Sequence, residues 1–181
     1  MTRGGAKMFM GARASANFPS PGLPVTSGHS MSRAEPVETR RFVSAHEAVT
    51  EETPFTLNAW LSRPDVVPCK DLLLVRATMP PGCCHPFHHH PTREEIIYVV
   101  SGQAEQWCGK ERRVLKPGEM VLIPKGEVHG TYNPFREPVV FLAILSPAGA
   151  APPDVVDVSG EAPWAGLRES HGLAPCRVRE A

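Results

Sequence analysis

The sequence predicts an all-β protein, built as a sandwich or barrel of short strands. Two observations support this fold class. Short runs rich in β-branched and aromatic residues recur through the middle of the chain, and Gly or Pro separates them. The chain also has 20 prolines, which gather in its ends and at the expected strand boundaries, where proline terminates strand pairing.

The N-terminal third is expected to lie outside the barrel. Residues 1–35 are rich in Gly, Ala, Ser and Pro and bury too little apolar surface to offset the entropy of ordering, so they are expected to form a disordered extension. Met31 is a plausible alternative to Met1 as the start of translation. Residues 36–66 are expected to form an N-terminal arm, in which the capping-box pattern at 44–47 opens a short helix and 54–60 form a strand.

The barrel itself is expected over residues 67–147. Its strands are predicted at 71–79, 94–100, 104–108, 112–115, 120–124, 128–133 and 139–145. Residues 148–181 are expected to form a tail with a short helix around 161–169, which docks Trp164 and Leu167 on the barrel and then frays.

A run of three histidines, His88 to His90, is the main functional signal. In an extended strand His88 and His90 share a face with Cα atoms about 6.6 Å apart, while His89 points the other way. Two imidazoles at that separation can converge on one metal ion at distances of about 2.0–2.1 Å. After a turn at Pro91, the next strand returns Glu94 or Glu95 to the histidine pair, and geometry leaves both open. A solvated surface loop is the competing interpretation of such a run.

Two ordered motifs extend this signal. The first is G-x5-H-x-H-x4-E-x6-G, and the second is G-x5-P-x-G-x2-H-x3-N. Their fixed positions are Gly82, His88, His90, Glu95, Gly102, Gly118, Pro124, Gly126, His129 and Asn133. The chain therefore resembles the cupin superfamily.

The resemblance implies an antiparallel jelly-roll β-barrel with one divalent metal in its interior, held by His88, His90, Glu95 and His129. The motif register selects Glu95 over Glu94. Asn133 is expected to stabilise a turn. The resemblance also implies a homodimer and suggests Glu95 as a catalytic base.

Three imidazoles and a carboxylate leave open positions on a bound ion, which could be iron, nickel, manganese, cobalt, copper or zinc. The leading functional hypothesis is a dioxygenase-type oxidoreductase that acts on a compact, oxygen-rich or phenolic small molecule. The alternatives are a metal-dependent sugar isomerase or epimerase, and a non-catalytic module that binds or senses a small ligand.

Composition sets further bounds. With 19 basic and 19 acidic residues, electrostatics favours neither nucleic acid nor an anionic membrane as a partner. No apolar run approaches the roughly 20 residues that cross a bilayer. The five cysteines are odd in number and lack C-x2-C spacing, which predicts reduced thiols in a cytoplasmic protein. A role for Cys84 at the metal is disfavoured, and His85 is expected to be solvated.

Overall fold

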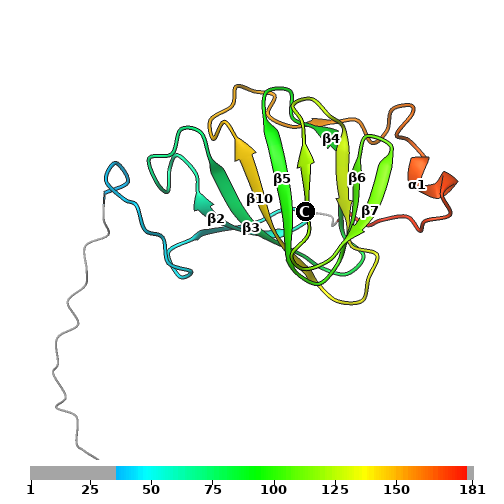
Figure 1. Cartoon of the computed structure of the whole chain (residues 1–181), viewed down its shortest axis with the longest axis horizontal. Helices are drawn as coiled ribbons and strands as arrows, with labels where there is room; N and C mark the ends of the chain where they lie inside the picture. Colours follow the sequence, from blue (N-terminus) through cyan, green and yellow to red (C-terminus); the bar gives the residue numbers. More distant parts are fainter. Residues whose placement is uncertain (1–35, 179–181) are drawn as a thin grey trace, which may run out of the picture. The chain divides into compact units, whose positions relative to one another are not determined.

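The computed structural model describes residues 36–178, which belong to one compact unit. The expected N-terminal extension and the alternative start at Met31 lie outside the described residues. Two antiparallel sheets face each other, one with the strand order β1-β2-β3-β10-β5-β8 and the other with the order β11-β4-β9-β6-β7. Figure 1 shows β10 and β5 in one layer and β6 and β7 in the other. The predicted all-β jelly-roll barrel is confirmed.

The elements of the described residues follow in chain order. They are β1 (Val49–Glu52), β2 (Leu57–Ser62), β3 (Leu73–Met79), β4 (Cys84–His89), β5 (Glu94–Ser101), β6 (Ala104–Cys108), β7 (Glu111–Leu115), β8 (Met120–Ile123), β9 (His129–Tyr132), β10 (Val139–Ser146), β11 (Val156–Asp157) and α1 (Leu167–Ser170).

The main core lies between the sheets and follows the two-residue period of the strands. On β10, the side chains of Val139, Phe141, Ala143 and Leu145 are buried, and the residues between them are only partly buried. The facing positions of β3 repeat the pattern, since β3 and β10 pair in register from Met79 to Leu73. Alternation of this kind is what places one face of a sheet in a core.

The N-terminal arm differs from expectation in two places. The backbone N–H of Ser44 donates to the Glu47 carboxylate at 2.8 Å, as a capping box would, but only a turn forms there and no helix is found among residues 36–56. The expected strand at 54–60 begins only at Leu57, because the Thr53 hydroxyl accepts from the N–H of Thr56 at 2.9 Å and closes a turn first. The unpredicted strand β1 pairs with β2, and its four residues are all exposed, so it lacks the alternation that would reveal it.

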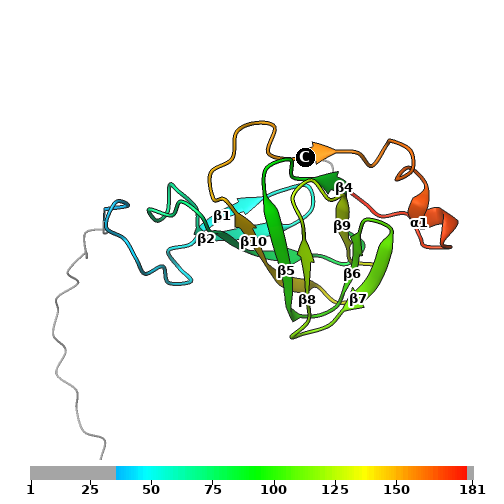
Figure 2. The same cartoon turned by 45° about the horizontal axis from the view of Figure 1, so that its top comes forward.

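The C-terminal tail crosses from one sheet to the other. After β10 it passes to the five-stranded sheet, where β11 pairs with β4 and α1 follows (Figure 2). The expected helix around 161–169 is wrong in extent, because α1 starts only after Gly166, whose φ of 73° is left-handed. Trp164 and Leu167 do pack on a second core cluster, as expected, with Phe87, Trp107 and Tyr132.

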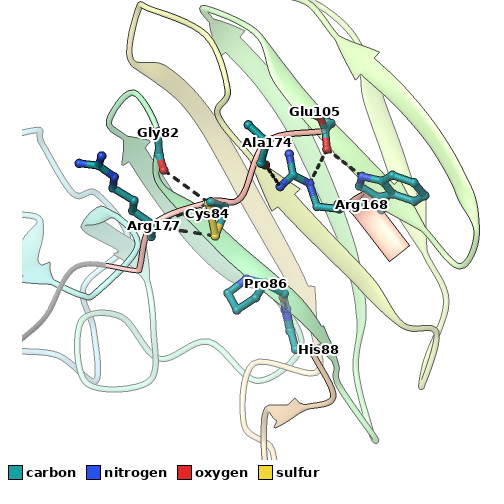
Figure 3. Close-up of a disulfide and its surroundings, with 10 residues drawn as sticks. Gly82, Cys84, Pro86, His88, Glu105, Arg168, Ala174 and Arg177 are labelled. Atoms are coloured by element: carbon teal, nitrogen blue, oxygen red, sulfur yellow. Dashed lines mark hydrogen bonds and ion pairs between the residues drawn. A yellow bond between two sulfur atoms is a disulfide. The ribbon is translucent and has the colours of Figure 1, made fainter. Parts of the chain in front are cut away.

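A disulfide joins Cys84 on β4 to Cys176 in the tail, with their Cα atoms 5.9 Å apart (Figure 3). The prediction of reduced thiols is therefore wrong for these two residues and holds for Cys69, Cys83 and Cys108. The two cysteines are separated by 92 positions, so their spacing does not indicate a pair. The odd number of cysteines in the chain gives no indication of it either. Disulfides persist mainly in oxidising compartments, so this bond counts against the predicted cytoplasmic location. Among the described residues, none of the helices has the length and apolar character needed to cross a membrane.

Candidate metal centre

Three strands bring the predicted ligands together. His88 lies on β4 and pairs directly with His129, the first residue of β9. His90 follows immediately after β4, and Glu95 comes from β5 in the opposite sheet. The centre is therefore built across the barrel interior.

The four side chains form one buried group. Their candidate ligand atoms all lie within 4.8 Å of one another. The Glu95 Oε2 atom lies 3.0 Å from Nε2 of His129 and 3.3 Å from Nε2 of His90. Glu94 is exposed, so the structure agrees with the motif register in bringing Glu95 to the histidines.

Each histidine is oriented by its second ring nitrogen. The Nδ1 atom of His88 lies 2.7 Å from the Pro86 carbonyl, that of His129 lies 3.0 Å from the Glu127 carbonyl, and that of His90 lies 2.8 Å from the Asp154 carbonyl. A carbonyl oxygen can only accept, so each Nδ1 carries the hydrogen and donates. All three Nε2 atoms are thereby left with a lone pair toward the group, which is the tautomer that metal ligation needs.

Two of the converging atoms lack partners. Glu95 Oε2 and His129 Nε2 are buried without a hydrogen bond of acceptable geometry, although they lie only 3.0 Å apart. A buried polar atom without a partner is costly, and native proteins rarely leave one. A cation between these atoms would satisfy both. The residues therefore fit a divalent metal with mixed imidazole and carboxylate ligands.

The electrostatics of Glu95 and His88 favour their ligating protonation states. Burial by itself raises the pKa of Glu95, but the imidazoles of His129 and His90 outweigh it and hold that pKa well below its usual range. Burial lowers the pKa of His88, and the neighbouring His85 lowers it further. Burial also lowers the pKa of His90, but Glu95 beside it reverses the shift and raises that pKa. Glu95 is thus an anion and His88 a neutral imidazole, as metal binding requires.

His85 is a member of the site that the sequence did not reveal. Its ring stacks on His88 with centroids 3.7 Å apart and on Phe55 at 4.5 Å. The ring lies between these two neighbours and is only partly exposed, so the expectation of a solvated histidine is wrong. Burial lowers its pKa to about 4. The register between β4 and β9 shifts between His85 and His88, and this irregularity breaks the simple alternation that would have placed His85 by counting. His89 is not part of the ligand group, as expected.

A cavity of about 320 Å³ is lined by three of the four candidate ligands, His88, His90 and His129. One wall is apolar and comes from the inward faces of β3, β5 and β10, with the side chains of Leu73, Val75, Ala77, Ile97, Phe141, Ala143 and Leu145. The N-terminal arm adds Phe55, Asn58 and Trp60. The polar side chains of the lining include His85, Arg93, Thr131 and Asp154 beside the histidine ligands. This arrangement can hold a compact molecule with a polar end at the ligands and an apolar body on the opposite wall.

Asn133 takes the structural role expected of it. Its side-chain amide donates to the carbonyls of Met79 at 3.0 Å and Glu137 at 2.9 Å, and its Oδ1 accepts from the N–H of Phe135. It stabilises the connection from β9 to β10 and does not belong to the ligand group.

Comparison with known proteins gives a consistent family assignment. A family model for the cupin domain matches residues 75–145. The pectin degradation protein KdgF of Dickeya dadantii is 29% identical over 103 residues, which cover 56% of this chain and 93% of that relative. The dimethylsulfoniopropionate lyase DddQ of Ruegeria pomeroyi is 44% identical over 54 residues, which cover 29% of this chain and only 26% of the lyase.

Solved structures share the same fold. The crystal structure of DddQ from Ruegeria pomeroyi matches with a TM-score of 0.53 and 27% identity, over 63% of this chain and 62% of that one. A protein from Klebsiella pneumoniae, described as having a double-stranded β-helix domain, matches with a TM-score of 0.51 and 26% identity, over 62% of this chain and 94% of that one.

Proposed function

The chain belongs to the cupin superfamily through its domain at residues 75–145, and on that premise we propose that it is a mononuclear metal-dependent enzyme of the dioxygenase type. Its substrate is a compact molecule with an oxygen donor at one end and an apolar body. The observation that carries the proposal is the convergence of four buried ligand atoms beside a cavity with an apolar wall.

A divalent ion held by His88, His90, Glu95 and His129 would supply Lewis acidity and, if it is iron, nickel, manganese, cobalt or copper, electron transfer at its open positions; zinc would supply Lewis acidity alone. The chain's own residues bind and orient the substrate. The apolar wall excludes water from one side of it, and the polar side chains near the ligands bind its oxygen-bearing end.

Glu95 is proposed as the base. Its Oε2 atom is buried, lacks a hydrogen bond and faces the ligand group, so it can accept a proton from a substrate hydroxyl.

A sugar isomerase or epimerase is the second candidate. The observation that favours it is the relation to KdgF, whose name places that relative in pectin degradation. The apolar wall favours the phenolic substrate instead, because hydroxyls on every side of a sugar would face Val75, Ala77 and Ala143 without partners. A binding or sensing module without catalysis is the remaining alternative.

Metal analysis and oxygen uptake test the proposal. The purified chain is reconstituted with iron, nickel or manganese, and oxygen consumption is followed with catechol as the probe. The expected result is one bound ion per chain and oxygen-dependent turnover, which His129→Ala abolishes and the exposed His46→Ala leaves unchanged. Turnover of a sugar without oxygen would support the isomerase, and tight binding without turnover the sensing module. A chain that takes up no divalent ion would refute both enzymes.

The proposal includes a homodimer. The apolar side chains of Tyr98 and Val100 on β5 and of Met120 and Leu122 on β8 are exposed, and Tyr98 pairs directly with Met120 across the two strands. A second copy would remove this apolar surface from water. Light scattering on the purified chain should give twice the monomer mass, and Leu122→Glu should halve it.

A further inference from the structure

The acceptors that orient the three histidines are not equivalent. His88 and His129 each donate to a carbonyl two positions earlier, on the same stretch of backbone. His90 donates to the Asp154 carbonyl, 64 positions away in the tail. The orientation of one ligand therefore depends on a segment outside the cupin domain at 75–145.

We propose that residues 148–158 complete the metal centre, and that Arg93 is the positioning residue that holds the Asp154 carbonyl against His90. This inference rests on the proposed metal-dependent function. It adds to the centre the hydrogen bond that orients His90 and the Arg93 contacts that hold the acceptor, and the acceptor lies outside the ligand motifs.

Arg93 holds this segment at two points. Its guanidinium contacts the Asp154 carboxylate at 2.9 Å and donates to the Ala148 carbonyl at 2.9 Å. The Arg93 side chain is only 7% exposed and its bond to Ala148 is buried, whereas the Asp154 side chain is 40% exposed. A planar guanidinium can make two such contacts at once with fixed geometry, which a lysine ammonium cannot reproduce. Arg93 thus fixes both the start of the segment and Asp154.

Strand pairing aligns the rest of the segment. Val156 pairs with His89 and Asp157 pairs with His88. The Val158 N–H donates to the Phe87 carbonyl at 3.0 Å. These contacts begin beyond Asp154, so the Asp154 carbonyl is set between the β11 ladder on one side and Arg93 on the other.

More distant anchors hold the end of the tail elsewhere on the same sheet. Arg168 binds Glu105 at 2.8 Å and Cys176 is bonded to Cys84 (Figure 3). None of these anchors contacts Asp154 directly. They keep the tail attached when the Arg93 contact alone is removed, which makes a selective test possible.

Loss of an outer hydrogen bond to a ligating histidine typically lowers metal affinity about 10–100-fold, because the ring is no longer held in the ligating orientation. We therefore expect Arg93→Met to weaken zinc binding by that factor, measured by competition with a chromophoric chelator. Arg113→Met is the matched control, since Arg113 also pairs with a carboxylate, that of Glu111, but is exposed. Its zinc affinity should equal that of the unaltered chain.

A second measurement separates positioning from a general loss of structure. In the zinc-loaded chain, the Nδ1 protons of His88, His90 and His129 should be protected from exchange in the NMR spectrum. Arg93→Met should abolish the protection at His90 alone. Arg93→Lys should restore zinc affinity only in part. If Arg93→Met fails to fold, Asp154→Asn, which keeps the backbone carbonyl and weakens the ion pair, should show the same selective change with a smaller loss of affinity.

Two outcomes would overturn the inference. Equal zinc affinity and equal His90 protection in Arg93→Met and the unaltered chain would overturn it alone. A chain that takes up no divalent ion before any substitution would overturn the proposed function, and this inference with it.

Discussion

The disulfide between Cys84 and Cys176 is expected to contribute a large and measurable part of the free energy of unfolding. The perturbation is reduction of the bond in the unaltered chain, with the double variant Cys84→Ala and Cys176→Ala as its genetic equivalent. The bond closes a loop with a separation of 92 positions. In the chain-entropy model a loop of this length corresponds to about 4.6 kcal/mol at 25 °C, and measured disulfides typically contribute about 2–4 kcal/mol.

Urea denaturation followed by tryptophan fluorescence measures this contribution. With a slope of about 2 kcal/mol per molar urea, a loss of about 2–4 kcal/mol lowers the midpoint by about 1–2 M. The reductant should have no effect on the double variant, and Cys69→Ala should respond to it as the unaltered chain does, because Cys69 is free. A midpoint that moves by less than about 0.2 M on reduction would refute the reasoning, because the loop would then be constrained equally well without the bond.

Three further predictions concern the ligands, the cavity and the second core. Glu95→Gln should lower zinc affinity at least about tenfold in a titration, because the amide cannot neutralise the ion, and unchanged affinity would exclude Glu95 as a ligand. Ala143→Leu should fill the apolar wall and weaken catechol binding to the zinc-loaded chain while leaving zinc affinity unchanged, and equal catechol binding would place the substrate elsewhere. Burial alone raises the pKa of Glu105, but hydrogen bonds from Arg168 and Trp107 hold it below its usual range, so its contribution is present at neutral pH and is lost as pH falls from about 4 through the lowered pKa. Glu105→Gln should therefore cost about 3 kcal/mol at pH 7 and progressively less below about pH 4, and a pH-independent difference in urea midpoint would contradict this.

The sequence predicts two kinds of feature. One is a strand whose buried residues repeat along the chain, and the other is a residue at a fixed position of a motif. Strands β3, β5 and β10 could be located because their buried residues alternate, and Glu95 could be chosen over Glu94 because the motif register depends only on chain position. His85 could not be placed, because a register shift between it and His88 turns on the pairing with β9, a strand far along the chain. The pairing of Cys176 with Cys84 could not be predicted for a similar reason, since it depends on how the tail docks on the sheet.

The Arg93 and Asp154 pair shows where prediction from local pattern ends. Arg93 lies at the predicted turn after Pro91 and Asp154 lies in the predicted C-terminal tail, yet together they hold the carbonyl that orients His90. The ligand motifs specify which atoms can bind a metal. They do not specify the acceptor that orients His90, because that acceptor comes from the tail that follows the domain. Cupins with the same four ligands but a different tail should therefore orient the histidine equivalent to His90 differently. We expect their metal affinities to diverge where their ligand sequences do not, and exchange of residues 148–158 between two such chains should transfer the difference in zinc affinity.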